Sequence, residues 1–264
     1  MHRIPTELLF VLLSLNPFSL RAQTFRVAAA SDLQFAMPEL AAQYERQSGA
    51  KIELSFGSSG NFFAQIQNGA PFALFFSADR SYAEKLIAAG QADPQSLSVY
   101  ALGRLALWAR SELNLKLTEK GLSALSDPRV QKIAIANPEH APYGRAAVAT
   151  LQKAGLYGQL KPKLVFGENI SQAAQFAQSG GAQVGMIALS LALSETMKSG
   201  ERWVVPGDYH PPLEQAAVLI NSGANKSQAA GFLEFVKSDA GRAILTRYGF
   251  TMPMPSTSDA EPKP

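Results

Sequence analysis

The sequence of 264 residues contains no cysteine and only three histidines, and after residue 22 it has no long apolar run. Without cysteine there is neither a disulfide framework nor a thiol that could carry a lipid anchor. A membrane-spanning helix needs about 20 consecutive apolar residues, so none is predicted. Lysine and arginine are scattered along the chain rather than clustered, which argues against nucleic acid as a partner.

The first residues have the pattern of a secretory signal peptide. Arg3 lies before the apolar stretch Leu8–Phe18, and the small residues Ser19 and Ala22 follow that stretch. Cleavage is predicted after Ala22, which makes residues 1–22 the signal peptide and leaves 22 basic and 20 acidic residues, a net charge near +2. An exported chain without an anchor is expected in the periplasm, where an outer membrane would confine it.

The rest of the chain alternates between short strands and helices, which favours an α/β fold with mixed, mostly parallel sheets. The run Leu102–Ala109 is predicted as one long strand that leads out of a first lobe, and Ala216–Asn221 as the strand that returns. Two crossings predict a two-strand hinge with a cleft between the lobes, where ligands commonly bind.

The predicted domain boundaries follow from these two crossings. Residues 23–103 form the first part of lobe 1, residues 104–216 form lobe 2, and residues 217–250 return to lobe 1. The proline-rich residues 251–264 are predicted to be a disordered tail.

Two serine segments follow strands in the first lobe and open helices. Ser31 ends FRVAAAS, and Ser58 and Ser59 lie in the FGSSG turn, where glycines permit close approach of the backbone. A hydroxyl beside unpaired N–H groups at a helix start can bind an anion, although each serine could equally be an ordinary helix cap. The carboxylate of Asp32 would repel an anion, so we expect it to face the helix start instead.

Two turns in the predicted second lobe offer further donors. Tyr143 follows Ala141-Pro142 at a helix start, where its N–H could donate to a ligand or its hydroxyl could cover the cleft. Ile170 follows Glu168-Asn169 at another helix start, which leaves its N–H free. The alternatives are a turn packed by tyrosine and a simple capped helix.

Enzyme and metal sites have weaker support in the sequence. The segment Gly57–Gly60 is not the five-residue nucleophile elbow, because Asn61 occupies the fifth position. A serine hydrolase would need His140 or His210 as its base. A metal site from Glu139, His140, Asp208 and His210 lacks a ligand pair at helical spacing. No catalytic residue, metal site or cofactor is therefore predicted.

Several stretches together resemble the periplasmic molybdate-binding proteins of molybdate ABC importers. They are AAASDLQFAMPELAAQ, FGSSGNFFAQIQNGAPFALFFSAD, IANPEHAPYGRAA, FGENISQAAQF and AQVGMIALS. The resemblance implies a two-lobed periplasmic binding protein of the second class, without enzymatic activity. It also implies a monomer that closes on molybdate, and on tungstate too, and delivers it to the membrane subunits of an ABC importer.

The resemblance also implies site residues. The family's oxyanion ligands fall on Ser31, Ser59, Tyr143 and Ile170, while Asp32 and Ser58 are possible additional contacts.

Two positions depart from the pattern of the family. Some members bind the anion with a tyrosine where this chain has Ala188, so that hydrogen bond must be absent or replaced by Tyr143. Members often carry aspartate where this chain has Ala73, a change that could alter sheet packing. These departures keep open a receptor for another tetrahedral oxyanion, such as sulfate or a phosphonate. An exported serine hydrolase is a more remote alternative.

Overall fold

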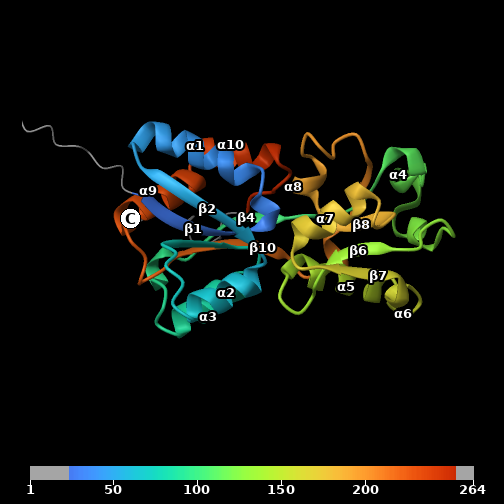
Figure 1. Ribbon diagram of the computed structural model, residues 1–264, viewed down its shortest axis with the longest axis horizontal. Coiled ribbons are helices and arrows are strands. Elements are labelled where there is room, and N and C mark those ends of the chain that lie inside the picture. Colours follow the sequence, from blue (N-terminus) through green and yellow to red (C-terminus); the bar gives the residue numbers. More distant parts are fainter. Residues whose placement is uncertain (1–23, 254–264) are drawn as a thin grey trace, which may run out of the picture.

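The computed structural model describes residues 24–253, which form two lobes placed side by side (Figure 1). Each lobe is built on a five-stranded sheet, with strand order β2-β1-β3-β10-β4 in the first and β7-β6-β8-β5-β9 in the second. Within residues 24–253, none of the helices has both the length and the apolar character needed to cross a bilayer. The predicted signal peptide, residues 1–22, lies outside the described residues.

The first sheet is mixed. Strands β1, β2 and β3 are parallel, and β10 is antiparallel to both of its neighbours, β3 and β4. Helices α1, α9 and α10 cover one face of this sheet, and α2 and α3 cover the other (Figure 1). The strands are β1 (Thr24–Ala30), β2 (Lys51–Gly57), β3 (Leu74–Ser77), β4 (Ser98–Gly103) and β10 (Leu213–Leu219), and the helices are α1 (Ala36–Ser48), α2 (Ser59–Gln67), α3 (Arg80–Ala88), α9 (Lys226–Lys237) and α10 (Asp239–Arg247).

The second sheet repeats this plan. Strand β6 is parallel to β7 and β8, while β5 is antiparallel to β8 and β9. A two-lobed α/β fold with mixed sheets is thus confirmed. The strands are β5 (Leu105–Ala109), β6 (Ile133–Ala136), β7 (Leu164–Gly167), β8 (Val184–Ala188) and β9 (Glu201–Val204), and the helices are α4 (Leu117–Lys120), α5 (Pro142–Lys153), α6 (Tyr157–Leu160), α7 (Ile170–Ser179) and α8 (Leu189–Ala192).

The starts of α2, α3 and α7, which follow strands, are capped by polar side chains. Ser58 accepts a hydrogen bond from the third residue of α2, and Asp79 and Asn169 accept from the first turns of α3 and α7. At its other end α1 stops at Gly49, whose φ of 71° suits glycine. Because these signals are local, the sequence predicted these helices close to their observed positions.

The prediction of one long strand over Leu102–Ala109 is wrong. Strand β4 ends at Gly103 in the first sheet, and β5 begins at Leu105 in the second, with Arg104 alone between them. An apolar run shows that both halves are buried, but not that they bond to different sheets. This single residue carries the chain from one lobe to the other.

The return crossing lies earlier than predicted. All of β10, from Leu213, pairs in the first sheet, although the predicted second lobe extended to residue 216. Pro211 and Pro212 lack backbone N–H donors, so the strand can begin only after them. The predicted tail begins later than expected, because the Thr251 N–H and C=O both bond to Leu102 in the first lobe. Residues 254–264 of that tail lie outside the described residues.

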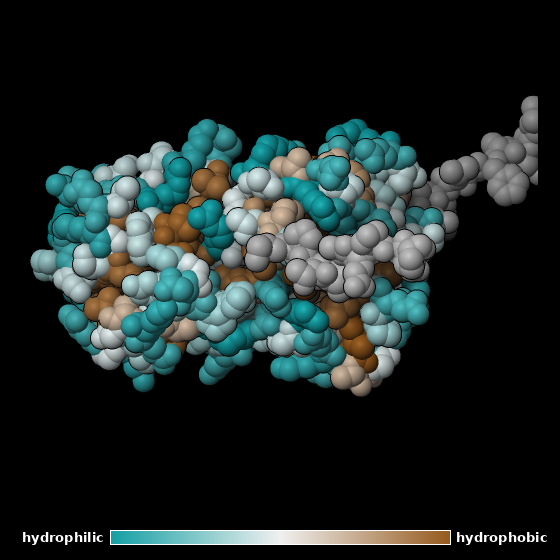
Figure 2. Space-filling model, turned by 180° about the vertical axis from the view of Figure 1, so that it is seen from behind, coloured by the Kyte–Doolittle hydropathy of each residue, from teal (hydrophilic) through white to brown (hydrophobic). Residues whose placement is uncertain are grey.

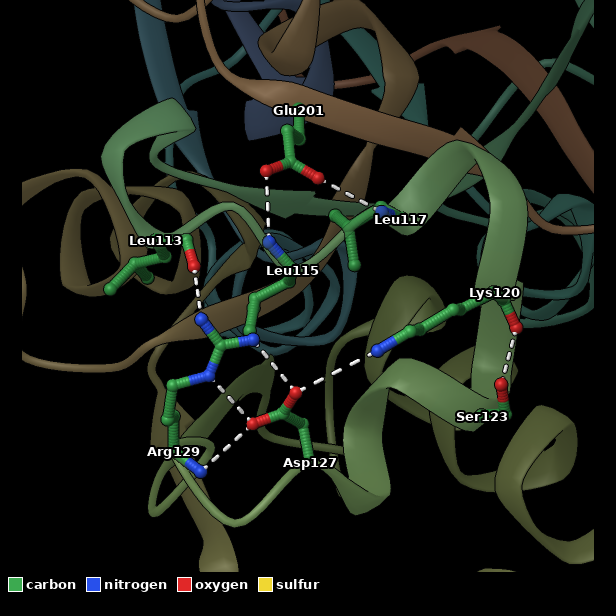
Figure 3. A network of polar contacts seen from close by, with 8 residues as sticks. All are labelled: Leu113, Leu115, Leu117, Lys120, Ser123, Asp127, Arg129 and Glu201. Atoms are coloured by element: carbon green, nitrogen blue, oxygen red, sulfur yellow. Dashed lines mark hydrogen bonds and ion pairs between the residues drawn. The ribbon is translucent and has the colours of Figure 1, made fainter.

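A polar network stabilises the segment between β5 and β6 in the second lobe (Figure 3). The Glu201 carboxylate accepts from the backbone N–H groups of Leu115 and Leu117, both at 2.9 Å. Hydrogen bonds from Arg129 hold the pKa of Asp127 well below its usual range. The Glu201 bonds hold this segment to β9, whose first residue is Glu201.

The surface seen from behind is mostly hydrophilic, with hydrophobic residues visible only in limited areas (Figure 2). The large hydrophobic side chain that stands out among the described residues is Phe166 in the edge strand β7, with 51% of its surface exposed. Single exposed hydrophobic side chains of this kind are normal in soluble proteins.

Candidate functional site

A small cavity lies between the two lobes. The first lobe lines it with the ends of β1 and β2 and the start of α2, and the second lobe with the starts of α5 and α7. The four predicted ligand residues and the two possible ones all line this one cavity. Its lining comprises Ala30, Ser31, Asp32, Gly57, Ser58, Ser59, Ala78, Ala141, Pro142, Tyr143 and Ile170.

Backbone N–H groups at three α-helix starts converge on this cavity. Ile170 is the first residue of α7, and the Asn169 side chain accepts from Ser171 and Gln172, which leaves the Ile170 N–H outside the cap. Tyr143 is the second residue of α5, and Ser59 is the first of α2. Such N–H groups have no carbonyl partner within their own helix and carry partial positive charge. The cavity therefore favours an anion without any cationic side chain.

Two serine hydroxyls are oriented by bonds that they accept. The Ser59 oxygen accepts from the Ala78 N–H at 3.0 Å, and the Ser31 oxygen accepts from the Ser171 N–H at 3.4 Å. A hydroxyl that accepts in this way still has its own proton to donate. Both serines are buried, so each hydroxyl proton has a strong preference for an acceptor inside the cavity.

Ser58 has a different part in the structure. Its oxygen caps α2 by accepting from the Asn61 N–H at 3.3 Å, and it lies 2.9 Å from His140 Nδ1 of the other lobe. Although this pair unites a serine with a histidine, as a hydrolase would, the serine oxygen is already used as a helix cap. The pair joins the lobes, and its position makes Ser58 a structural neighbour of the cavity.

Further contacts hold the lobes together around the cavity. The Gly60 N–H donates to the His140 carbonyl at 2.9 Å, and the Ser190 hydroxyl donates to the Asp32 carbonyl at 2.6 Å. The structure is therefore a closed arrangement in which second-lobe groups bond directly to the first lobe beside the cavity.

An ion pair closes the side of the cavity near α3. Arg145 Nη2 lies 2.6 Å from Asp79 Oδ2, and Arg145 Nη1 donates to the Tyr82 hydroxyl at 3.2 Å. Both charged side chains are partly exposed, and pairs of this kind contribute about 1 kcal/mol or less. Such a weak contact suits a closure that has to be reversible.

Replacing Gly60 by alanine should oppose closure. An added Cβ would lie 2.7 Å from the His140 carbonyl oxygen, and that oxygen belongs to the other lobe. In the open protein the added Cβ would still lie 2.8 Å from the Tyr82 hydroxyl of the same lobe, so that side chain must shift, and the helix preference for alanine over glycine offsets part of the cost. We expect calorimetry to show ligand affinity lowered about tenfold or more, equivalent to about 1.4 kcal/mol. Unchanged affinity would contradict the closed arrangement, and Gly158→Ala, with open space around its Cβ position, is the control.

The Tyr143 hydroxyl does not cover the cleft. It lies against Gly103, where an added Cβ would collide with both the hydroxyl and the Gln215 amide nitrogen. Burial and the nearby Asp32 carboxyl raise the pKa of Tyr143 well above its usual value. With the hydroxyl placed under the crossing strands, the backbone N–H remains the group of Tyr143 that suits a ligand in the cavity.

Asp32 is the one acidic residue in the lining, and 1% of its surface is exposed. Among the described residues, neither of its carboxylate oxygens has a hydrogen-bond partner of standard geometry. Burial raises the pKa of Asp32 to about 7, opposed by the nearby Tyr143 hydroxyl, the Gln215 amide and the backbone amides of Asp32 and Leu33. Asp32 lies in the 3₁₀ helix η1 (Ser31–Leu33), whose start has no side-chain cap hydrogen bond, so the role expected of Asp32 at a helix start stays a prediction.

The two departures from the family pattern lie outside the lining. Ala188 ends β8 opposite Leu105 and is fully buried. Ala73 donates its N–H to the Arg26 carbonyl within the first lobe and packs closely against Gly223. Ala73 therefore belongs to the packing of the first sheet, in the way the sequence suggested.

The sequence analysis missed the polar residues behind the cavity. Gln215 is fully buried in β10, and its Oε1 accepts from the Tyr100 hydroxyl at 3.4 Å. A glutamine inside the apolar run LEQAAVL was the available signal, because a buried amide needs a reason to be there. His140, Asp79 and Arg145 carried no such signal, since their contacts form only between the lobes.

A family profile described as "Bacterial extracellular solute-binding protein" matches residues 25–251. The chain belongs to this family. It is 39% identical over 234 residues to the molybdate-binding protein ModA of Rhodobacter capsulatus, which covers 88% of this chain and 90% of the relative. It is 37% identical over 231 residues to ModA of Azotobacter vinelandii, with 87% and 90% covered.

Solved structures give the same result for the fold. The periplasmic molybdate-binding protein of Azotobacter vinelandii superposes with a TM-score of 0.81 at 34% identity, covering 87% of this chain and all of that one. The sulfate-binding protein SubI of Mycobacterium tuberculosis superposes with a TM-score of 0.68 at 12% identity, with 88% of both chains covered. The second match shows a shared fold alone. This solute-binding protein is therefore a binding protein and not an enzyme.

Proposed function

We propose that this solute-binding protein captures molybdate, and also tungstate, between its two lobes. The main support for this proposal is that three helix starts and two serine hydroxyls line one cavity between the lobes. The chain is also similar to two proteins named for molybdate binding. Ser31 and Ser59 donate their hydroxyl protons, and Tyr143 and Ile170 donate their N–H groups.

Neutral donors suit a dianion that must leave water. None of the described residues in the lining is a lysine or arginine, so hydrogen bonds and helix starts replace the hydration shell. A donor left unpaired in such a cavity costs about 1–3 kcal/mol, enough for a tenfold preference between oxyanions of different size. Sulfate, the smaller ion, leaves some donors stretched.

Delivery is the second part of the proposal. One relative, at 27% identity, is named a putative ABC transporter substrate-binding lipoprotein of Bacillus subtilis, and the resemblance points to a periplasmic receptor. We propose that this protein works as a periplasmic monomer. Its closed form presents both lobes together to the membrane subunits of an ABC importer, so docking depends on the loaded state.

Thermal unfolding with a series of oxyanions tests the proposal. Molybdate and tungstate should each raise the melting temperature, since a ligand at 100 times its dissociation constant adds about 2.7 kcal/mol of stability. Sulfate and phosphate at the same concentration should have little effect. A rise with sulfate alone would favour the alternative of a sulfate receptor, which the shared fold with a sulfate-binding protein keeps in view.

A further inference from the structure

A polar cluster lies behind the anion cavity, and Asp32 connects the two. Asp32 lines the cavity, and the Tyr143 hydroxyl and Gln215 amide lie next to its carboxyl. Tyr100 on β4 completes the cluster through its bond to Gln215. The cluster thus connects β4 and β10, the strands next to the two crossings between the lobes, to α5 of the second lobe. None of its four residues is cationic.

Within the part of the chain that the structure describes, no positively charged side chain acts on the Asp32 carboxyl. The ionisable groups that face it are the Tyr100 and Tyr143 hydroxyls, which burial and Asp32 itself keep neutral by raising their pKa. Helices α7 and α8, which pack on η1, carry no ionisable side chain in their sequences. The charged residues of β2, Lys51 and Glu53, pair beside Thr24 and Arg26, at the end of the strand remote from Gly57.

A bound dianion and an ionised Asp32 are therefore incompatible. Both would lie in one buried site whose described lining has no cationic side chain, so neutral donors alone would have to stabilise both charges, and like charges at short range in a protein interior repel strongly. Two buried acids that share a site resolve this conflict by holding a proton. A protonated carboxyl is neutral and gains an O–H donor, whereas the ionised form only accepts.

We propose that Asp32 binds a proton when the lobes close on the oxyanion, so that one proton enters the site with each dianion. The inference rests on the proposed function, because it concerns the same cavity. Asp32 is thus a residue that sets the charge and the pH dependence of the site, in addition to the four donors.

The proposal predicts how much proton uptake occurs at each pH. Burial in the closed arrangement raises the pKa of Asp32 to about 7, so relative to this closed form without an anion the acid is already protonated at pH 6 and binding takes up little. Uptake should be about half a proton at pH 7 and close to one at pH 8 and above. Over the same range, each pH unit above 7 should lower the affinity for the dianion by up to about tenfold.

Calorimetric titration of the mature chain with molybdate at pH 6, 7 and 8 tests the proposal. At each pH the titration is repeated in buffers with different ionisation enthalpies. The slope of the observed heat against the ionisation enthalpy of the buffer gives the number of protons taken up. Asp32→Asn should bind without proton uptake and with a flat pH profile. Asp208→Asn, which removes an exposed acid that Lys153 pairs outside the lining of the cavity, should keep the uptake of the unmodified protein.

The outcomes separate this inference from the proposed function. Binding with no buffer dependence at pH 8, or uptake that persists in Asp32→Asn, would overturn the role of Asp32 and leave the receptor intact. No heat with molybdate, tungstate or sulfate would overturn both proposals. If Asp32→Asn fails to fold, infrared difference spectra of the unmodified protein decide: a carboxylic acid band that appears on binding at pH 8 supports the proposal, and its absence refutes it.

Discussion

Replacing Ser31 and Ser59 together by alanine should abolish the rise in melting temperature that molybdate produces. The double variant loses both hydroxyl donors of the first lobe, and two oxygens of a buried dianion are then left without them. Hydrogen bonds to a charged group are worth about 1.5–3 kcal/mol each, so the affinity should fall at least a hundredfold. Thermal unfolding with and without molybdate measures the loss.

The structure also predicts a cost for the ligand-free double variant. Ser59 accepts from the buried Ala78 N–H, and alanine leaves that donor unpaired at about 1–3 kcal/mol. The sequence alone does not reveal this bond, because it joins Ser59 to the backbone of a different segment. Ser194→Ala is the matched control: this buried serine lies outside the cavity lining, so stability should fall while the molybdate shift remains. A double variant that still binds would remove the site assignment.

Asp32→Asn should change how the stability of the ligand-free protein depends on pH. The pKa of Asp32 is raised from 3.8 to about 7 in the folded state. Above pH 4 the unfolded chain gives up this proton while the folded protein keeps it, so the free energy of unfolding falls as pH rises. The loss is about 1.4 kcal/mol per pH unit and levels off above pH 7 at about 4 kcal/mol. Asparagine keeps the shape of the side chain and cannot ionise, so it removes this pH-dependent contribution to the free energy of unfolding.

Urea unfolding between pH 4 and pH 8 without oxyanion measures this effect. Between pH 4 and pH 8, the free energy of unfolding should fall less in Asp32→Asn than in the unmodified protein. The control is Asp127→Asn: Arg129 lowers the pKa of Asp127, so the contribution of this carboxylate is lost only below about pH 4, and the variant should keep the pH dependence of the unmodified protein between pH 4 and pH 8. Equal pH dependence in Asp32→Asn and the unmodified protein would show that Asp32 is ionised in the folded state at neutral pH.

Local signals explain why much of the site could be predicted. A serine or asparagine between a strand and an amphipathic run predicts a helix start, and Ser31, Ser59 and Ile170 lie at such starts. Tyr143 follows Pro142, which is favoured in the first turn of a helix. These signals act over a few residues, so they do not depend on the arrangement of the lobes.

Long-range pairing explains the errors. The sequence treated Leu102–Ala109 as one strand and returned the chain to the first lobe after residue 216. An apolar run reports burial, whereas the sheet to which a strand belongs depends on partners far away, here β10 for Leu102 and β8 for Leu105. Only the assembled sheets could place the crossings at Arg104 and before Leu213.

The amino-acid order by itself determined the α/β class, the helix starts and the neutral donors, because capping, chain breaks and apolar periodicity operate between close neighbours in the chain. The tertiary structure alone decided which of these starts share one cavity, which way the Tyr143 hydroxyl turns, and that the Asp32 carboxylate has no hydrogen-bond partner among residues 24–253. These properties arise from groups more than a hundred positions apart, such as Asp32 and Ser190. Burial and charge at Asp32 are set by what folding brings around it, and no stretch of sequence records that environment.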